Sequence, residues 1–267
     1  MEYRSIGFIG AGNMGGAIIR GILRAGIFTK ENIMAADHSE AALRKQAEEL
    51  GIRTTTDNRE LVKSSDILLL SVKPSVLPAV IAEIADEVRE DQLIISIAAG
   101  QSLERLEGLF GRKLPMIRVM PNTPALVGEG MAALSPNELV SEEASAFALK
   151  IFESFGQAEI LPEKLQDVVV GVSGSSPAYV YMMIEAMADA AVADGMPRAQ
   201  AYKFAAQAVL GSAKMVLETG QHPGALKDAV CSPGGTTIEA VALLEQLGFR
   251  SAVIEAQRAC VAKSKEL

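Results

Sequence analysis

The segment Ser5-Ile6-Gly7-Phe8-Ile9-Gly10-Ala11-Gly12-Asn13-Met14-Gly15 places a G-x-G-x-x-G loop directly after a short apolar run. In such a loop Gly10 would form the tight turn, Gly12 would let the backbone approach a phosphate, and Gly15 would pack the next helix against the strand. The free N–H groups at the start of that helix would face a pyrophosphate. Because a helical pattern and a second strand pattern follow at the expected spacing, we predict a dinucleotide-binding domain.

Outward from this loop, the sequence pattern changes near residue 160. Up to that point short β-branched or leucine-rich runs alternate with helical patterns, which is typical of a mostly parallel sheet covered on both faces. Beyond it the sequence is helical and rich in alanine and methionine, with long helices predicted over 177–194 and 198–219. We predict an α/β fold: a Rossmann-type, mostly parallel sheet (residues 1–160) followed by an all-helical C-terminal domain for substrate binding and dimerisation (residues 161–267). The predicted strands are Ser5–Ile9, Ile33–Ala36, Asp66–Val72, Gln92–Ile97 and Met116–Met120.

The two long predicted helices are apolar over too wide an arc for a helix exposed on one side. Small residues such as Ala186, Ala190 and Ala193 would let a partner helix approach closely. On pattern alone, a dimer interface and helices buried within one monomer are equally compatible with this composition.

The composition excludes several classes of protein. With a net charge of −8 and a pI near 5.0, the chain lacks the basic surface that nucleic-acid binding requires. Its apolar runs are far shorter than the roughly twenty residues that span a bilayer, and its start shows no export-signal pattern. The two cysteines and two histidines stand in no zinc-binding spacing. We expect a soluble, cytoplasmic protein with no metal site, no nucleic-acid partner and no membrane contact.

The end of the second predicted strand should distinguish NAD from NADP. Asp37 stands there, and an acidic residue at this place accepts the ribose 2′-OH of NAD and repels the 2′-phosphate of NADP. Taken alone, this residue favours NAD. His38 and Ser39, with Asn58 and Arg59, could still hold a 2′-phosphate if Asp37 turned away, although His38 is equally compatible with a solvated loop.

Three further strand ends should meet at the same edge, because ligands of open α/β sheets lie beyond the carboxyl ends of the strands. Lys73 could face the nicotinamide riboside or the substrate, or it could be an ordinary surface lysine. Asn122 is a further cofactor-binding candidate. The three strand ends are Ser71-Val72-Lys73-Pro74, Ala98-Ala99-Gly100 and Met120-Pro121-Asn122-Thr123-Pro124.

The most distinctive segment of the second half is Asp228–Glu239, which contains Ser232-Pro233-Gly234-Gly235-Thr236-Thr237. Thr236 and Glu239 have the spacing of a capping box, so the glycines and threonines would lie at the start of a helix. The free N–H groups of such a helix attract an anion, and a small carboxylate would fit there without an arginine. A plain helix cap with a glycine-rich entry is the alternative, and the segment alone favours it.

Five motifs, in order along the whole chain, closely resemble the pyrroline-5-carboxylate reductase family. They are Gly10–Gly15, Met120–Pro124, Ser173–Tyr179, His222–Asp228 and Ser232–Thr237. The resemblance implies reduction of 1-pyrroline-5-carboxylate to L-proline, the last step of proline biosynthesis, with NADPH or NADH. It also implies helical domains that interlock as a dimer, a substrate loop that could serve the neighbouring subunit, and rings of five dimers. Since the family commonly favours NADPH, we expect NADPH first, against the local indication at the second strand end.

The resemblance also assigns site residues. Pro162 and Ala229 stand where other members can carry polar residues, and this leaves their roles undefined. For substrate binding it implies Val230, Ser232, Gly234, Gly235, Thr236 and Thr237, with Glu163 nearby. For cofactor binding it implies Gly10, Ala11, Gly12, Asn13, Met14, Gly15, Asn58, Ser71, Val72, Lys73, Pro74, Ala98, Ala99 and Gly100, to which the strand-end argument adds Asp37, His38, Ser39 and Asn122.

These assignments suggest a mechanism that needs no histidine. A substrate held as its iminium accepts a hydride readily, so the protein mainly has to position the reactants. We expect Thr237 to hydrogen-bond the ring nitrogen and the N–H groups of Gly235 and Thr236 to hold the carboxylate, which makes the two threonines the catalytic candidates. Cys231 has no histidine beside it in sequence and is expected to be a neutral thiol, not a nucleophile.

Two rival hypotheses can be weighed on the sequence. A β-hydroxyacid dehydrogenase has a similar domain order, but Val180 and Ile184 stand where that family carries a lysine and an asparagine, and apolar side chains cannot do acid–base work. A catalytically silent NADPH-binding protein is the second rival, because a fold does not prove activity. The intact polar segment Ser232–Thr237 argues against it.

Overall fold

The computed structural model describes residues 3–266; the first two residues and the last one lie outside the described part. By their contacts the described residues form two compact units. The first contains the residues up to Gly174 together with those from Cys260 onward, and the second contains Ser175–Ala259. The contacts thus divide the chain later than the expected boundary after residue 160, because Gln166 is buried against the sheet and hydrogen-bonds the Ala133 carbonyl oxygen.

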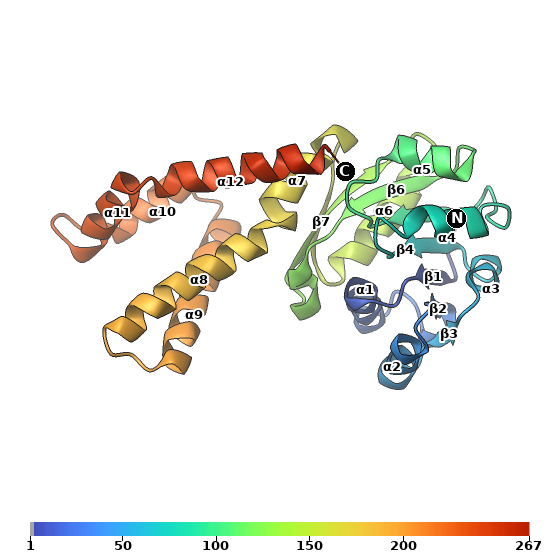
Figure 1. Cartoon of the computed structure of the whole chain (residues 1–267), viewed down its shortest axis with the longest axis horizontal. Coiled ribbons are helices and arrows are strands. Elements are labelled where there is room, and N and C mark those ends of the chain that lie inside the picture. The colour runs from blue at the N-terminus through green and yellow to red at the C-terminus, as the bar shows by residue number, and fades with distance from the viewer. Residues whose placement is uncertain (1–2, 267) are drawn as a thin grey trace. The chain divides into compact units, whose positions relative to one another are not determined.

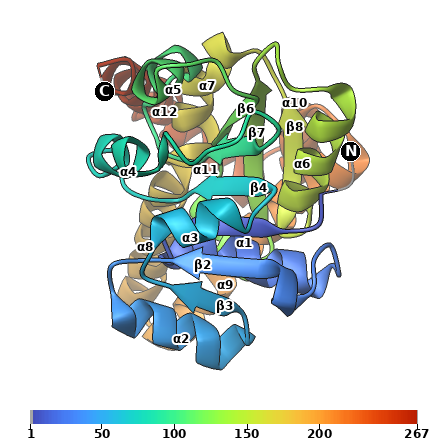
Figure 2. The same ribbon diagram turned by 90° about the vertical axis from the view of Figure 1, so that its right-hand side faces the viewer.

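One eight-stranded sheet, with strand order β3-β2-β1-β4-β5-β6-β7-β8, forms the first unit (Figure 1, Figure 2). Strands β1 to β6 run parallel, β7 is antiparallel to β6, and β8 is parallel to β7. This confirms the predicted mostly parallel, Rossmann-type sheet. The bounds are β1 Ile6–Ile9, β2 Ile33–Ala36, β3 Arg53–Thr55, β4 Ile67–Leu70, β5 Leu93–Ser96, β6 Met116–Met120, β7 Gly130–Pro136 and β8 Gly156–Ile160.

Helices cover both faces of the sheet, because its central strands are apolar on both sides. On one face α1, α2 and α6 pack against alternate strand residues such as Phe8, Leu69 and Ile95. On the other face α3, α4 and α5 pack against the residues in between, such as Leu68 and Ile94. The bounds are α1 Asn13–Arg24, α2 Glu40–Leu50, α3 Asn58–Lys63, α4 Leu77–Ile84, α5 Leu103–Phe110 and α6 Glu142–Glu153, with 3-10 turns η1 Lys30–Asn32 and η2 Thr123–Val127.

Three strands of the sheet, β3, β7 and β8, were not predicted from the sequence. Strand β3 has only three residues, and its first, Arg53, is exposed. Strand β7 is rich in alanine, and β8 exposes Gln157 and Glu159. Strands β7 and β8 lack the run of β-branched residues that is typical of a buried strand, and β3 contains Thr54 and Thr55 but is too short to show a strand pattern. They are strands because of their pairing with neighbours, which local composition does not reveal.

After β8 the chain stays in the first unit through η3 Glu163–Leu165, α7 Gln166–Val169 and the π-helical turn η4 Val170–Gly174. The far end of the chain returns to this region. Ser264, near the carboxyl terminus, donates a hydrogen bond from its hydroxyl to Asp167 Oδ1 at 2.8 Å. The last residues therefore complete the first unit.

The second unit is all-helical, as predicted. Helix α8 (Ser176–Ala193) and helix α9 (Arg198–Thr219) match the predicted ranges to within one residue at each end, and they pack along each other. None of the described helices is long and apolar enough to cross a membrane. The other helices are α10 Pro223–Val230, α11 Thr236–Gln246 and α12 Phe249–Ser264, drawn in orange to red in Figure 1; the last of them continues into the first unit.

Candidate functional site

The glycine loop between β1 and α1 has the conformation that its sequence predicts. Gly10 has a φ of +106°, which side chains rarely adopt, and a Cβ there would lie 2.6 Å from the Ser71 carbonyl oxygen. A Cβ on Gly15 would lie 2.7 Å from the Gly10 carbonyl oxygen. Both positions therefore require glycine, one for the turn and one for the close approach of α1 to the strand.

Gly12 forms the N-cap of α1 and has open space beside it. Among the described residues no side chain caps this helix, and a Cβ on Gly12 would meet no atom within 4 Å. The N–H groups of the first turn, including those of Asn13 and Met14, have no acceptor within the helix. Free N–H groups beside open space, at the positive end of a helix dipole, form a cradle that fits a diphosphate.

Asp37 follows β2, and its carboxylate turns toward the glycine loop. Its Oδ2 accepts the Ala11 N–H at 2.8 Å, and its Oδ1 accepts the Ser39 N–H at 2.9 Å. Ser39 in turn caps α2 by accepting the Ala42 N–H. The exposed His38 places Nδ1 3.2 Å from Asp37 Oδ1. Asp37 thus ties the loop to the start of α2, at the strand end where Rossmann domains hold the adenosine ribose.

Ser71, which directly follows β4, also hydrogen-bonds the glycine loop. Its hydroxyl donates to the Gly10 carbonyl oxygen at 2.7 Å, and its N–H donates to the Ile9 carbonyl oxygen. Residues 72–74 continue from β4 at this edge, and residues 98–100 follow the neighbouring parallel strand β5. The structure therefore brings the predicted cofactor residues of the first unit to one edge of the sheet.

Two of the predicted cofactor residues, Asn58 and Asn122, have partners within the protein. Asn58 begins α3, and its Nδ2 donates to Glu83 Oε2 at 2.9 Å. Asn122 is buried; its Oδ1 accepts the Met131 N–H at 2.8 Å and its Nδ2 donates to the Ser173 carbonyl oxygen at 3.0 Å. The Asn58 side chain thus joins α3 to α4, and the Asn122 side chain joins β7 to η4. Direct contact with a cofactor stays a prediction for both residues.

Glu163 belongs to an ion-pair network of the first unit that the sequence analysis missed. Its Oε1 accepts the Leu103 N–H at 2.7 Å and lies 3.2 Å from Arg118 Nη1. Arg118 is 8% exposed, and its Nη2 also lies 3.7 Å from Asp167. A buried charge requires such partners. The single arginine inside the apolar run Met116–Met120 was the signal that could have revealed this network.

In the second unit, residues 232–235 form a turn before α11. The Gly235 N–H donates to the Ser232 carbonyl oxygen at 3.0 Å, and Gly234 has a φ of +67°, as a type II turn requires. Helix α11 begins at Thr236 as expected, but its N-cap is Gly235 and no described side chain caps it. The predicted capping box is wrong, because Thr236 is already helical and does not occupy the cap position.

The start of α11 therefore has free backbone N–H groups that could donate hydrogen bonds to a ligand. The N–H groups of Thr236, Thr237 and Ile238 have no acceptor within the helix, and the dipole of this 11-residue helix favours an anion here. Thr237 is half-buried, while Thr236 and Val230 are exposed. The predicted substrate residues of the second unit thus form one continuous segment at a helix start that fits a small carboxylate.

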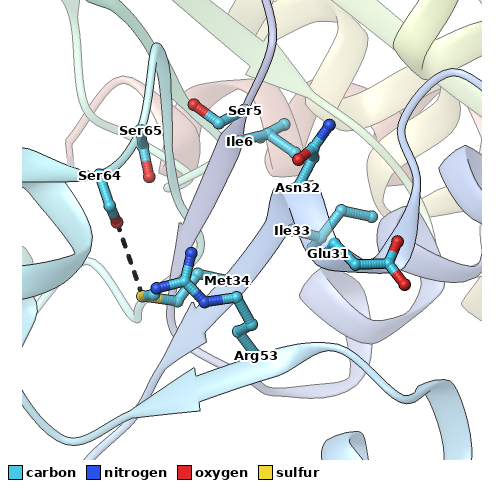
Figure 3. A pocket seen from close by; sticks show the side chains of 9 residues that line it. All are labelled: Ser5, Ile6, Glu31, Asn32, Ile33, Met34, Arg53, Ser64 and Ser65. Carbon is cyan, nitrogen blue, oxygen red and sulfur yellow. Dashed lines mark hydrogen bonds between the residues drawn. The ribbon is translucent and has the colours of Figure 1, made fainter.

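A cavity of about 120 Å³ lies at the opposite edge of the sheet, near the amino ends of β1 and β2 (Figure 3). Its lining includes Ser5, Glu31 and Arg53. The glycine loop follows the carboxyl end of β1, so this cavity is not the predicted cofactor site. Throughout the described part of the chain, no group of three or more His, Cys, Asp or Glu residues is placed to hold a metal ion.

Comparison with known proteins decides between the families considered. Residues 163–267 match the sequence model for pyrroline-5-carboxylate reductase dimerisation, and residues 5–100 match that for NADP oxidoreductase, coenzyme F420-dependent. The pyrroline-5-carboxylate reductase of Escherichia coli strain K12 is 54% identical over 264 residues, which cover 99% of this chain and 98% of that protein. The chain belongs to the pyrroline-5-carboxylate reductase family.

Solved pyrroline-5-carboxylate reductases share the fold across the whole chain. The Coxiella burnetii structure is 34% identical with a TM-score of 0.93, and the match covers 99% of this chain and 98% of that one. The Plasmodium falciparum structure, described with NADP bound, is 34% identical with a TM-score of 0.90 and coverage of 100% and 98%. As a pyrroline-5-carboxylate reductase family member, the chain is an oxidoreductase with a nicotinamide cofactor, and its dimerisation region supports a homo-oligomer. The β-hydroxyacid dehydrogenase hypothesis is excluded.

Proposed function

We propose that this protein reduces 1-pyrroline-5-carboxylate to L-proline with NADPH, as the last step of proline biosynthesis. The observation that carries the proposal is the segment Ser232–Thr237, a glycine turn that leads into an uncapped helix start. A substrate with one carboxylate and one protonated ring nitrogen needs a few N–H donors for the carboxylate and a hydroxyl oxygen that accepts a hydrogen bond from the nitrogen. The identity of 54% with a named pyrroline-5-carboxylate reductase supports the same activity.

In the first unit, the cofactor diphosphate would lie against the N–H groups of Gly12, Asn13 and Met14. The segments 72–74 and 98–100, at the ends of β4 and β5, would border the nicotinamide half. When bound, the cofactor supplies the hydrogen and the two electrons that reduce the C=N bond. The contribution of the protein is to hold the reacting groups in a fixed orientation.

In the second unit, the substrate carboxylate would accept a hydrogen bond from the free N–H group of Thr236; the Gly235 N–H, the other predicted donor, already donates to the Ser232 carbonyl oxygen within the turn. The Thr237 hydroxyl would hydrogen-bond the ring nitrogen, an interaction with a charged centre that contributes about 1.5 to 3 kcal/mol. The proton that the product amine needs is already on the iminium nitrogen. Glu163 stays a candidate for substrate contact on family resemblance, since Arg118 and the Leu103 N–H already engage its carboxylate.

Preference for NADPH over NADH is part of the proposal. It is supported by the match of residues 5–100 to an NADP oxidoreductase family and by the NADP described for the Plasmodium falciparum relative. The Asp37 carboxylate faces the glycine loop, with hydrogen bonds to the N–H groups of Ala11 and Ser39. The exposed His38 imidazole and the Ser39 hydroxyl would then be the donors beside the ribose 2′ position.

We also propose a homodimer through the helical units, in which the substrate loop of one subunit serves its neighbour. The only residues buried in α8 and α9 are Ala188, Ala201 and Ala205. A large exposed apolar surface marks a protein interface. A ring of five dimers rests on the family resemblance alone. The exposed apolar side chains of this unit include Tyr181, Met182, Phe204, Leu210, Met215, Leu217, Leu243, Leu244, Leu247, Val253 and Ile254.

The expected cytoplasmic location also belongs to the proposal. Cys231 and Cys260 form no disulfide bond in the described part of the chain. Reduced thiols persist in the cytosol, so this chemistry agrees with that compartment. Cell fractionation with an antibody against the native protein would test the location.

The activity is tested by mixing purified protein, NADPH and 1-pyrroline-5-carboxylate and following both the loss of cofactor absorbance and the formation of proline. We expect turnover with this substrate and none with NADP⁺ and 2-hydroxy acids. NADPH binding without turnover would support the silent binding protein instead. Turnover confined to hydroxy- or keto-acids would contradict the proposal.

A further inference from the structure

We infer that Gln46, a buried residue of α2, is a positioning residue for cofactor binding. The inference rests on the proposed role of the glycine loop in holding the cofactor diphosphate. Gln46 is 6% exposed, and its Nε2 donates a hydrogen bond to the Ala11 carbonyl oxygen at 3.1 Å. The residue would not touch the cofactor itself, so any effect on binding must pass through the loop.

The hydrogen bond from Gln46 fixes the peptide group that joins Ala11 to Gly12. In a planar trans peptide the carbonyl oxygen and the following N–H point in opposite directions. By holding the Ala11 oxygen toward α2, Gln46 turns the Gly12 N–H away from α2. That N–H is one of the donors of the diphosphate cradle, and Gly12 is exposed with open space beside it.

The side chains of Asp37 and Gln46 both hydrogen-bond the backbone of Ala11. Asp37 Oδ2 accepts the Ala11 N–H at 2.8 Å, while Gln46 donates to the carbonyl oxygen of the same residue. Both polar groups of this backbone residue are thus fixed by side chains, in a loop that has no regular secondary structure to fix them. A loop ordered before the ligand arrives does not have to be ordered by binding, which improves affinity.

Two further observations favour a functional reason for a glutamine here. A Cβ on Gly16 would lie 2.7 Å from Gln46 Nε2, so the amide reaches the first turn of α1 because residue 16 is a glycine. Gln46 Oε1 is buried, and it has no hydrogen-bond partner among the described residues. A buried amide with one unsatisfied atom costs stability that an apolar side chain of the same shape would not. Stability alone would therefore favour methionine or leucine at this position.

The test measures binding of NADPH and of NADH to the full-length protein by cofactor fluorescence, with no substrate present. Gln46→Met keeps the size of the side chain and removes the donor. The Kd of both cofactors, which share the diphosphate, should rise by a similar factor of roughly three to ten, the effect of one ordinary hydrogen bond. The KM for NADPH should rise with it, while kcat at saturating cofactor stays within about twofold of wild type.

Gln92→Met is the matched control for this substitution. Gln92 is also fully buried and donates to the carbonyl oxygens of Val62 and Ser65, but it precedes β5 at the opposite edge of the sheet. This variant should lower the melting temperature and leave both Kd values unchanged. Unchanged Kd values in Gln46→Met, or equal losses in the two variants, would overturn the inference.

A second variant covers the case in which Gln46→Met does not fold. Gln46→Glu keeps the shape of the side chain but sets a carboxylate oxygen against the Ala11 carbonyl oxygen, so it should weaken binding of both cofactors at least as much. Normal cofactor affinity in this variant would equally overturn the inference. Normal NADPH binding by the wild type without reduction of 1-pyrroline-5-carboxylate would count against the proposed function and leave the role of Gln46 standing.

Discussion

Thr237 lies half-buried in the first turn of α11, and its hydroxyl is the proposed partner of the substrate nitrogen. Thr237→Ala should lower kcat/KM about ten- to a hundredfold, because a hydrogen bond to a charged centre is lost in the transition state. Folding should be intact, since alanine is a good helix former. Steady-state kinetics and a thermal melt check both statements.

Thr219→Ala is the control, because Thr219 is a threonine of the same unit whose exposed hydroxyl donates to the Met215 carbonyl oxygen of its own helix and accepts the Gln221 N–H just beyond it. This variant should have wild-type kinetics. If Thr237→Ala behaves like it, Thr237 has no part in the reaction.

Asp37 combines two effects on cofactor binding. Its charge would repel a 2′-phosphate, while its two oxygens hold the N–H groups of Ala11 and Ser39. Asp37→Ser removes both effects. We expect the ratio of kcat/KM for NADPH over NADH to rise about tenfold as the repulsion between the two charges disappears, and the affinity for both cofactors to fall as the loop loosens.

Asp37→Asn separates the two effects, because it removes the charge but keeps one acceptor oxygen for the loop. The cofactor ratio should rise in this variant with a smaller loss of affinity. An unchanged ratio in both variants, measured by steady-state kinetics with each cofactor, would show that this carboxylate does not select between NADPH and NADH.

At the scale of single elements, the turn before α11 depends on the positive φ of Gly234. In Gly234→Ala the added Cβ would meet no atom within 4 Å. The substitution should therefore lower stability only through backbone strain at the positive φ, about 1 to 2 kcal/mol, and it should shift the turn. We expect the KM for 1-pyrroline-5-carboxylate to rise roughly five- to tenfold, because the shifted turn would displace the free N–H group of Thr236.

Gly220, the C-cap of α9, provides the matched substitution. Its φ is +62° and its Cβ would also meet nothing within 4 Å. Gly220→Ala should therefore lower the melting temperature as much as Gly234→Ala does, with no change in KM. A rise in KM in both variants would mean that the stability of the second unit, and not the conformation of the turn, controls substrate affinity.

The sequence predicted those elements whose signal is local. The five buried strands and the helices α8 and α9 have long apolar patterns, and Gly10 and Gly15 are needed by their own backbone geometry. Strands β7 and β8 could not be predicted, because only pairing with β6 and with each other makes these alanine-rich or polar segments extended. The capping box failed for a different reason: Thr236 and Glu239 have the required spacing, but Gly235 occupies the N-cap position and Thr236 is already helical.

The candidate site shows the same limit. The segments at the strand ends and at the start of α11 could be predicted, because glycine, serine and threonine follow recognisable patterns there. The residues that support them could not. Gln46 and Arg118 act through contacts with residues 35 and 45 positions away, and no spacing rule connects such partners. A polar residue inside an apolar helix face or strand was the only available sign.

At the scale of the whole molecule, the proposed dimer makes a prediction about Phe204, which lies on α9 with 67% of its surface exposed. In an isolated chain, Phe204→Asp would replace an exposed apolar side chain with a charged one and would cost little folding stability. In a dimer held by this surface it would place a charge in the interface and dissociate the subunits. Light scattering after size exclusion should show the monomer mass for this variant.

Val127→Asp is the control for the assembly, since Val127 is 77% exposed on the first unit. It should leave the mass of the oligomer unchanged. A wild-type mass for Phe204→Asp would mean that Phe204 lies outside the interface between the subunits.

The return of the chain to its first unit has a consequence for how the protein is made. The ribosome releases the sheet strands first, then the whole second unit, and only at the end Ser264, which binds Asp167. Domains generally fold during synthesis from the amino terminus, but here the cofactor-binding unit stays unfinished until the residues from Cys260 onward have been synthesised. Nascent chains stalled before residue 260 should therefore remain more sensitive to protease in their first unit than released chains.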